Sequence, residues 1–223
     1  MSVWDKIWCH DSYSDPELRR IKAKYKVDMF KDLISINSNS VCVDVGCGGG
    51  YISKEVFNKY KCSLFSLDNS HTAIEYAKQN NQFDKMHYLV SPAQKMELPD
   101  AIADVVFCIG VLEHITDIDI ALKEIDRIIK CGGRIVIITS NLYSSMFFDR
   151  LLKQLLGKWR YGYQKNWKLS KLKDKLKENG FSIYNFSVHQ GFGDFEKKNK
   201  LDKIINKLIP TWGRYIQIIG GKE

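Results

Sequence analysis

The chain has 223 residues and 44% hydrophobic content, which is enough to bury one sizeable core, so we expect a single domain. It has no run of 18 apolar residues and no basic-then-apolar N-terminal segment, so we expect no spanning helix, no secretion and cytoplasmic residence. The net charge of +8 is concentrated in residues 151–223, where 16 Lys or Arg face 6 Asp or Glu. This basic part favours an anionic partner, such as a phosphorylated or carboxylated substrate, an acidic membrane surface or RNA; the alternative is a solvated lysine-rich face.

Residues 1–37 are expected to form an N-terminal helical cap, with a helix near 17–35. Its first 13 residues carry Trp4, Trp8, His10 and Tyr13. Two interpretations are open. The segment is either a flap that closes over a ligand and excludes water, or a staple that fixes the first helix to the body.

Residues 41–50 contain the most informative motif of the chain. Three valines alternate along a predicted buried strand at 41–45, and the strand leads into a turn rich in glycine. Glycine permits positive φ and close approach of a ligand to the main chain. Since a helix is predicted over 51–60, a nucleotide-like cofactor is expected at the carboxyl end of this strand.

Two common phosphate-binding motifs are excluded here. No Lys-Ser or Lys-Thr follows Gly46 at P-loop spacing, and Tyr51 occupies the third glycine position of a dinucleotide fingerprint. Asp44, two residues before the first glycine, would repel an anionic group and attract a cationic amine.

The following segments continue an alternation of strands and helices. We predict strands at 63–67, 86–90, 104–109, 134–139, 181–187 and 213–219, and helices at 70–80, 117–129, 145–157, 169–179 and 197–208. This order predicts an α/β fold with a doubly wound, Rossmann-like parallel sheet and a ligand at the carboxyl ends of its strands.

Five segments between about residues 38 and 140, in this order, resemble the motifs of class I S-adenosylmethionine-dependent methyltransferases. They are VDVGCGGG at 43–50, LFSLDNS at 64–70, SPAQKMELPD at 91–100, ADVVFCIGVLEH at 103–114, and 122–140 with its Cys-Gly-Gly turn. The resemblance is to methyltransferase-11 and quinone-biosynthesis-like small-molecule enzymes. It implies a seven-stranded sheet whose last strand is antiparallel, and S-adenosylmethionine as cofactor, with S-adenosylhomocysteine as product. The expected organisation is a cofactor-binding core at 38–140 and, at 141–223, a lid helix and the substrate side.

The resemblance also implies roles for single residues. Asp68, with Asn69 beside it, is expected at the ribose, and its spacing from Asp44 agrees with that of a ribose-binding carboxylate. The remaining cofactor contacts are expected from the methionyl side (Asp44, Gly46, Cys47, Gly48, with Ile109 near the amine) and from the adenine side (Ala93, Gln94). Pro92 stands where many members have an Asp for the adenine amine.

His114 is the candidate general base, with Glu113 beside it; alternatively, both orient their loop. Quinone-precursor members with a metal site carry a Glu four residues before this His, and here that position is Gly110. No metal is therefore expected. Six cysteines show no zinc spacing and are expected to be reduced.

Residues 144–159 have an apolar stripe with basic edges, for which a substrate lid, a membrane-surface helix and a helix packed on the core are alternatives. Motifs of DNA-base, cytosine-C5 and arginine methyltransferases are absent. We therefore expect an acceptor that is a small, anionic or amphiphilic, lipid-like metabolite, methylated on O, N or C. The alternatives are an RNA methyltransferase that uses the basic C-terminal part, and a noncatalytic scaffold that binds the cofactor.

Overall fold

The computed structural model describes residues 2–10, 15–189, 204–205 and 207–223. Seven strands form one sheet in the order β3-β2-β1-β4-β5-β7-β6. The strands are β1 (Val41–Val45), β2 (Ser63–Asp68), β3 (Met86–Val90), β4 (Ala103–Ile109), β5 (Ile129–Ser140), β6 (Ser182–His189) and β7 (Tyr215–Gly221). The helices are α1 (Val3–His10), α2 (Pro16–Phe30), α3 (Tyr51–Tyr60), α4 (His71–Asn80), α5 (Ile118–Ile128), α6 (Ser145–Leu155) and α7 (Leu169–Glu178), and a 3-10 turn covers Leu112–His114.

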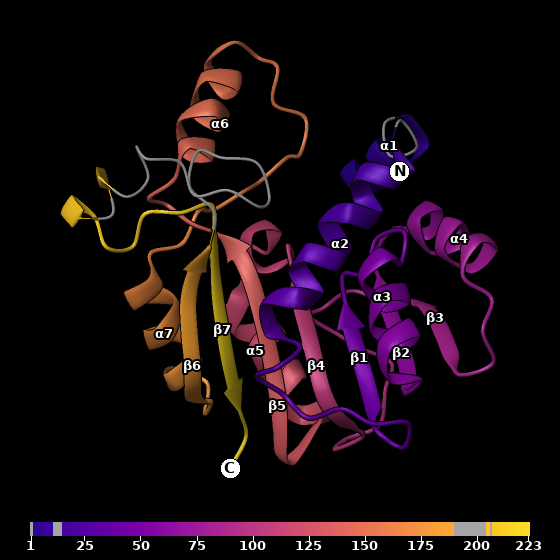
Figure 1. The fold of residues 1–223 in the computed structure, drawn as a ribbon. Coiled ribbons are helices and arrows are strands. Elements are labelled where there is room, and N and C mark those ends of the chain that lie inside the picture. The colour runs from indigo at the N-terminus through magenta and orange to yellow at the C-terminus, as the bar shows by residue number, and fades with distance from the viewer. Residues whose placement is uncertain (1, 11–14, 190–203, 206) are drawn as a thin grey trace.

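The expected topology is confirmed (Figure 1). Strands β1 to β5 pair in parallel, whereas β7 runs antiparallel to both β5 and β6. The strand order reverses at β1 and β4, and such a switch point is where open α/β sheets bind ligands.

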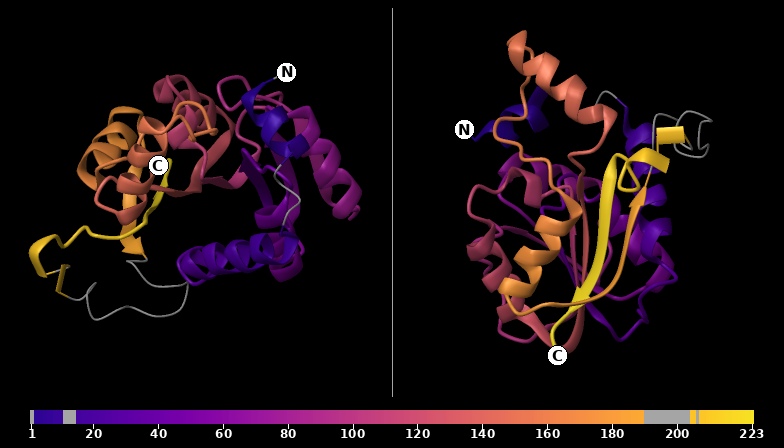
Figure 2. Two further views of the ribbon diagram at one scale, coloured as in Figure 1. Left: turned by 90° about the horizontal axis from the view of Figure 1, so that it is seen from above. Right: turned by 90° about the vertical axis from the view of Figure 1, so that its left-hand side faces the viewer.

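Helices lie on both sides of the sheet (Figure 2), and alternating strand residues supply a core to each side. On one side, Val43 and Val106 pack in the same cluster as Leu122 of α5. On the other, Phe107 packs with Phe30 of α2, their ring centroids 5.2 Å apart. Burial of both faces explains why the central strands β1, β4 and β5 contain nearly continuous apolar runs, whereas the edge strands β3 and β6 do not.

Several boundaries differ from the sequence-based prediction. Helix α2 ends at Phe30, five residues early, because the chain leaves the helix in a turn in which the Leu33 amide donates to the Phe30 carbonyl. Strand β5 begins at Ile129 and includes the predicted Cys-Gly-Gly turn, since Ile129 already pairs with Ala103. The predicted helix at 197–208 falls largely outside the described residues.

The strand ends that matter for function meet at one edge. The parallel strands, β1 among them, point towards the top of the view in Figure 1, the side on which α1 and the first turns of α2 lie. The glycine turn after β1 and the 3-10 turn after β4 are therefore brought together.

Candidate functional site

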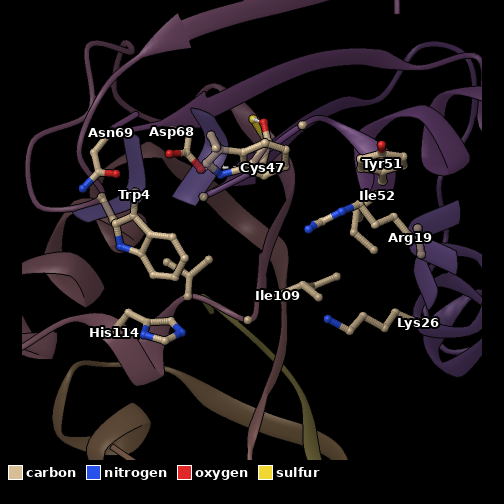
Figure 3. A pocket seen from close by; sticks show the side chains of 18 of the residues that line it. Trp4, Arg19, Lys26, Cys47, Tyr51, Ile52, Asp68, Asn69, Ile109 and His114 are labelled. Atoms are coloured by element: carbon tan, nitrogen blue, oxygen red, sulfur yellow. Dashed lines mark hydrogen bonds between the residues drawn. The ribbon is translucent and has the colours of Figure 1, made fainter. Parts of the chain in front are cut away.

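A cavity of about 360 Å³ opens at this edge of the sheet (Figure 3). It is lined by residues from α1, α2, the glycine turn, the loops after β2 and β3, and the loop after β4. Eight of the nine predicted cofactor residues line it, as does the candidate base His114; the eight are Gly46, Cys47, Gly48, Asp68, Asn69, Ala93, Gln94 and Ile109.

The glycine turn has a conformation and a packing that other residues do not tolerate. Gly46 and Gly48 have φ of +70° and +53°. A Cβ on Gly46 would collide with the Val111 side chain, and one on Gly48 would lie 2.7 Å from the Trp8 ring. Glycine is required here for both the backbone angle and the close approach.

Asp68 is held by the turn that it faces. Its carboxylate accepts hydrogen bonds from the amides of Gly48 (2.8 Å) and Ser70 (2.9 Å). Burial nevertheless raises the pKa of Asp68 above its usual value. The residue combines a fixed carboxylate with access to the cavity, as the ribose assignment requires.

Asp44 lies behind the turn and is not among the residues that line the cavity. It is buried, and its carboxylate accepts a 2.6 Å hydrogen bond from the hydroxyl of Ser53, which in turn accepts one from Ser66. Burial is the main cause that raises the pKa of Asp44 to about 7; the neighbouring Asp68 carboxylate adds to the rise and Lys26 opposes it. The Asp44 carboxylate therefore does not line the cavity, and its predicted contact with the cofactor's amine stays a prediction.

The two members of the Glu113-His114 pair have different environments. Glu113 is buried, and its carboxylate accepts hydrogen bonds from Thr139 (2.6 Å) and Ser140 (2.9 Å) on β5. It does not line the cavity. These contacts match the interpretation of Glu113 as a residue that orients its loop.

His114 faces the cavity beside Trp4, with ring centroids 4.7 Å apart in an edge-to-face arrangement. Its Nδ1 lies 2.9 Å from the carbonyl oxygen of Tyr163. Since a carbonyl only accepts, we assign the proton to Nδ1, which leaves Nε2 as the basic nitrogen of the neutral ring. That tautomer suits a general base.

Helix α1 covers the glycine turn. Trp8 is buried against Gly48 and Gly49, and the Asp5 carboxylate accepts a 2.7 Å hydrogen bond from Ser70 at the start of α4. This hydrogen bond is the first cause that lowers the pKa of Asp5 to about 2. These contacts fix α1 to the rest of the domain, and α1 also forms a wall of the cavity. Tyr13 and the side chain of His10 lie outside the described residues.

Sequence analysis missed a group of cations on α2. Arg19, Lys22 and Lys26 all line the cavity. Figure 3 shows Arg19 and Lys26 on the opposite side of the cavity from Asp68 and Asn69. Their i, i+3, i+7 spacing was readable in the sequence, but only the tertiary fold shows which face of α2 meets the cavity.

Helix α6 has no buried residue. It stands above the sheet edge in Figure 1, and Phe148, Leu152 and Leu155 are 62%, 56% and 78% exposed. The interpretation as a helix packed on the core is therefore wrong, and the lid and membrane-surface interpretations stay predictions.

Three further observations concern the cysteines, metal ions and membrane spans. All six cysteines are free thiols, and four of them are buried. The described residues include no cluster of three or more His, Cys, Asp or Glu arranged to hold a metal ion. Among the same residues, no helix has the length and apolar character needed to cross a bilayer.

The sequence is similar to those of known methyltransferases. Residues 43–137 match a protein-family model described as a methyltransferase domain. The chain is 30% identical over 151 residues to a ubiquinone biosynthesis O-methyltransferase of Pelagibacter ubique. The aligned region covers 65% of this chain and 62% of the relative. A Rickettsia bellii protein of the same name is 28% identical over 73% of this chain and 70% of its own length. The chain thus spans less than two thirds of the Pelagibacter relative.

Solved structures share the fold at low sequence identity. A S-adenosylmethionine-dependent methyltransferase of Thermotoga maritima superimposes with a TM-score of 0.74 at 18% identity, over the whole of both chains. The geranyl diphosphate C-methyltransferase of Streptomyces coelicolor superimposes with a TM-score of 0.73 at 12% identity, over 96% of this chain and 88% of its own.

Proposed function

We propose that this chain, which resembles the class I S-adenosylmethionine-dependent methyltransferases, transfers a methyl group from S-adenosylmethionine to an O, N or C atom of a small-molecule or lipid-like metabolite. The observation that carries the proposal is one cavity in which the Asp68 carboxylate, the glycine turn and His114 face a common space.

The residues present fit the cofactor. Asp68 would accept hydrogen bonds from the ribose hydroxyls, beside Asn69, because its carboxylate is fixed by two amides and still faces the cavity. Ala93 and Gln94 would flank the adenine. Gly46, which lines the cavity, would begin the cradle for the methionyl part.

Charge would orient the methionyl end. Its amine would meet the backbone of Gly46, Cys47, Gly48 and Ile109, with the charge of Asp44 behind the turn. Lys26, whose ammonium would lie 3.7 Å from a Cβ on Gly110, is placed to bind the cofactor's carboxylate. Burial lowers the pKa of Lys26, and the nearby Glu113 and Asp44 carboxylates oppose that effect.

The bound cofactor supplies an already activated methyl group on a sulfonium, so the protein has to orient the acceptor and keep the site dry. Trp4 and Trp8 of α1 close one side of the cavity. For an acceptor hydroxyl, Nε2 of His114 would take the proton. Glu113 would act by holding the His114 loop on β5 through Thr139 and Ser140.

A cytoplasmic site of action belongs to this proposal, because six free thiols suit a reducing compartment.

The test combines binding and transfer. We expect calorimetry to give micromolar affinity for S-adenosylmethionine and S-adenosylhomocysteine, and we expect label to pass from a methyl-labelled donor to a component of a metabolite extract. Binding without transfer to any component would support the noncatalytic scaffold instead, and transfer only to RNA would support the RNA methyltransferase. Absence of binding would refute the cofactor assignment.

A further inference from the structure

Helix α2 lines the cavity with three cations and keeps its other cations outside. Arg19, Lys22 and Lys26 line the cavity, whereas Arg20 and Lys24 do not; Arg19 and Lys26 are half-buried, and Lys22 is exposed at the cavity's outer side, as are Arg20 and Lys24. Arg20 instead forms a surface ion pair with Glu17, 3.8 Å away. The helix therefore presents its charge to the cavity on one defined face.

Nearby acids act on two of these cations through their charge, Asp15 on Lys22 and both Glu113 and Asp44 on Lys26. Among the described residues, no salt bridge joins Arg19, Lys22 or Lys26 to an acid. Arg19 lies over the Trp8 ring, its guanidinium carbon 5.2 Å from the ring centroid, which fixes the side chain without neutralising it. The carboxylates nearest the cavity accept hydrogen bonds from backbone amides and hydroxyls instead.

Like charges this close repel one another, and they lose hydration on the wall of a cavity. Burial lowers the pKa of Lys22, and the Arg19 charge lowers it further. A bound anion would reduce the repulsion between these cations. A guanidinium fork with an ammonium one turn away suits the oxygens of a carboxylate or a phosphate.

The cofactor cannot neutralise the whole wall. It carries a single carboxylate, which we assigned to Lys26, and its sulfonium is itself a cation. Arg19 and Lys22 are therefore left for another ligand. Resting on the function proposed above, we propose that Arg19 and Lys22 form an anion subsite of the acceptor, which therefore carries a carboxylate or phosphate group.

The experiment uses the full chain saturated with S-adenosylhomocysteine and two simple probes, inorganic pyrophosphate and malonate, titrated by calorimetry at constant ionic strength. We expect at least one probe to bind, and Arg19→Gln/Lys22→Gln to weaken that binding at least tenfold. The matched control Arg20→Gln/Lys24→Gln changes two cations of the same helix and should leave probe binding within twofold. The probe that binds more tightly identifies the phosphate or the carboxylate as the preferred group.

Two further readouts separate this subsite from the cofactor site. The Arg19/Lys22 variant should keep its affinity for S-adenosylhomocysteine within threefold; a large loss would assign these cations to the cofactor and overturn the subsite. Arg19→Lys keeps the charge but removes the fork, and it should give intermediate probe binding in a protein that retains its fold.

Label transfer supplies the second arm. Passing the metabolite extract over an anion-exchange resin should remove the acceptor, and the salt eluate should restore transfer. Transfer that survives in the flow-through, or equal weakening of probe binding by both double variants, would overturn the anion subsite but leave the methyltransferase assignment intact. Failure of the wild-type protein to bind S-adenosylhomocysteine would instead refute the proposed function itself.

Discussion

Asp44→Asn tests how the carboxylate behind the glycine turn affects folding. The substitution keeps the size of the side chain and an oxygen that can accept from Ser53, but it removes the titratable proton. Burial raises the pKa of Asp44 from 3.8 to about 7. A shift of about three units corresponds to roughly 4 kcal/mol of differential stability between the protonated and ionised forms.

The sign follows from proton uptake. Between about pH 4 and pH 7 the folded protein keeps the Asp44 proton that the unfolded chain has already lost, so the free energy of unfolding falls as the pH rises through this window. Protonated Asp44 is uncharged, so its burial disfavours folding least in acid, below the pKa of the unfolded chain. Above pH 7 the folded protein contains a buried carboxylate.

Urea unfolding of the ligand-free protein from pH 5 to pH 8 provides the measurement. We expect the free energy of unfolding of Asp44→Asn, measured relative to that of wild type, to rise by about 2 to 3 kcal/mol between pH 5 and pH 8. Asp68 and Lys26 also titrate with shifted pKa values, but both are present in the two proteins, so the difference reports Asp44. A difference that stays constant with pH would refute the assigned pKa.

The same substitution tests the expected link to the cofactor. A bound amine favours the ionised Asp44, so the wild-type affinity for S-adenosylhomocysteine should increase as the pH rises towards about 7. In Asp44→Asn this increase should largely disappear, which calorimetry over the same pH range would detect. An unchanged pH dependence in the variant would show that Asp44 does not interact with the amine.

Three further predictions concern the walls of the cavity. Asp68→Asn should weaken S-adenosylhomocysteine binding by about 2 to 4 kcal/mol in calorimetry, because two hydrogen bonds to a charged acceptor are weakened; Asp100→Asn, on the exposed surface, is the control that should not. Gly48→Ala should lower both the affinity and the melting temperature, since its Cβ would meet Trp8 at 2.7 Å, whereas Gly157→Ala, with φ of +64° and open space around its Cβ, should incur only the backbone cost of about 1 to 2 kcal/mol. His114→Gln should reduce label transfer to a hydroxyl acceptor at least about a hundredfold, while S-adenosylhomocysteine affinity stays unchanged; transfer that stays close to the wild-type rate would exclude His114 as the base.

The local parts of the site could be predicted from the sequence because local chemistry determines them. The strand, glycine turn and helix at 41–60 follow from β-branched alternation and from glycines that the structure places at positive φ. Asp68 was found by its position at the end of the next strand, which the parallel pairing of β1 and β2 places beside the turn.

The sequence did not predict which side chains would face the cavity. Asp44 and Glu113 belong to the right motifs, yet their carboxylates are hydrogen-bonded to Ser53 and to Thr139 and Ser140, away from the cavity lining. A strand or turn residue changes sides with a single step along the chain, so a motif identifies the segment more securely than the direction of each side chain.

Long-range packing was the other part beyond prediction. The helical spacing of Arg19, Lys22 and Lys26 was visible in the sequence, but a charged helix face is usually exposed to solvent. Only the tertiary fold shows that this face of α2 lines the cavity. The position of Trp8 over Gly48 and Gly49 similarly depends on a contact between segments forty residues apart in sequence, which no local pattern encodes.

The distribution of charge across the cavity links these observations. On the sheet side, Asp44 and Asp68 lie behind and beside the glycine turn; on the helix side, the charged residues that α2 contributes to the cavity lining are all cations. A zwitterionic ligand would be oriented by this arrangement, with its amine towards the sheet and its carboxylate towards Lys26. Among the described residues, no salt bridge joins these acids to Arg19 or Lys22, so the two cations stay available on the helix side. The polarity that would orient the cofactor therefore also leaves positive charge at the place where an anionic acceptor would enter.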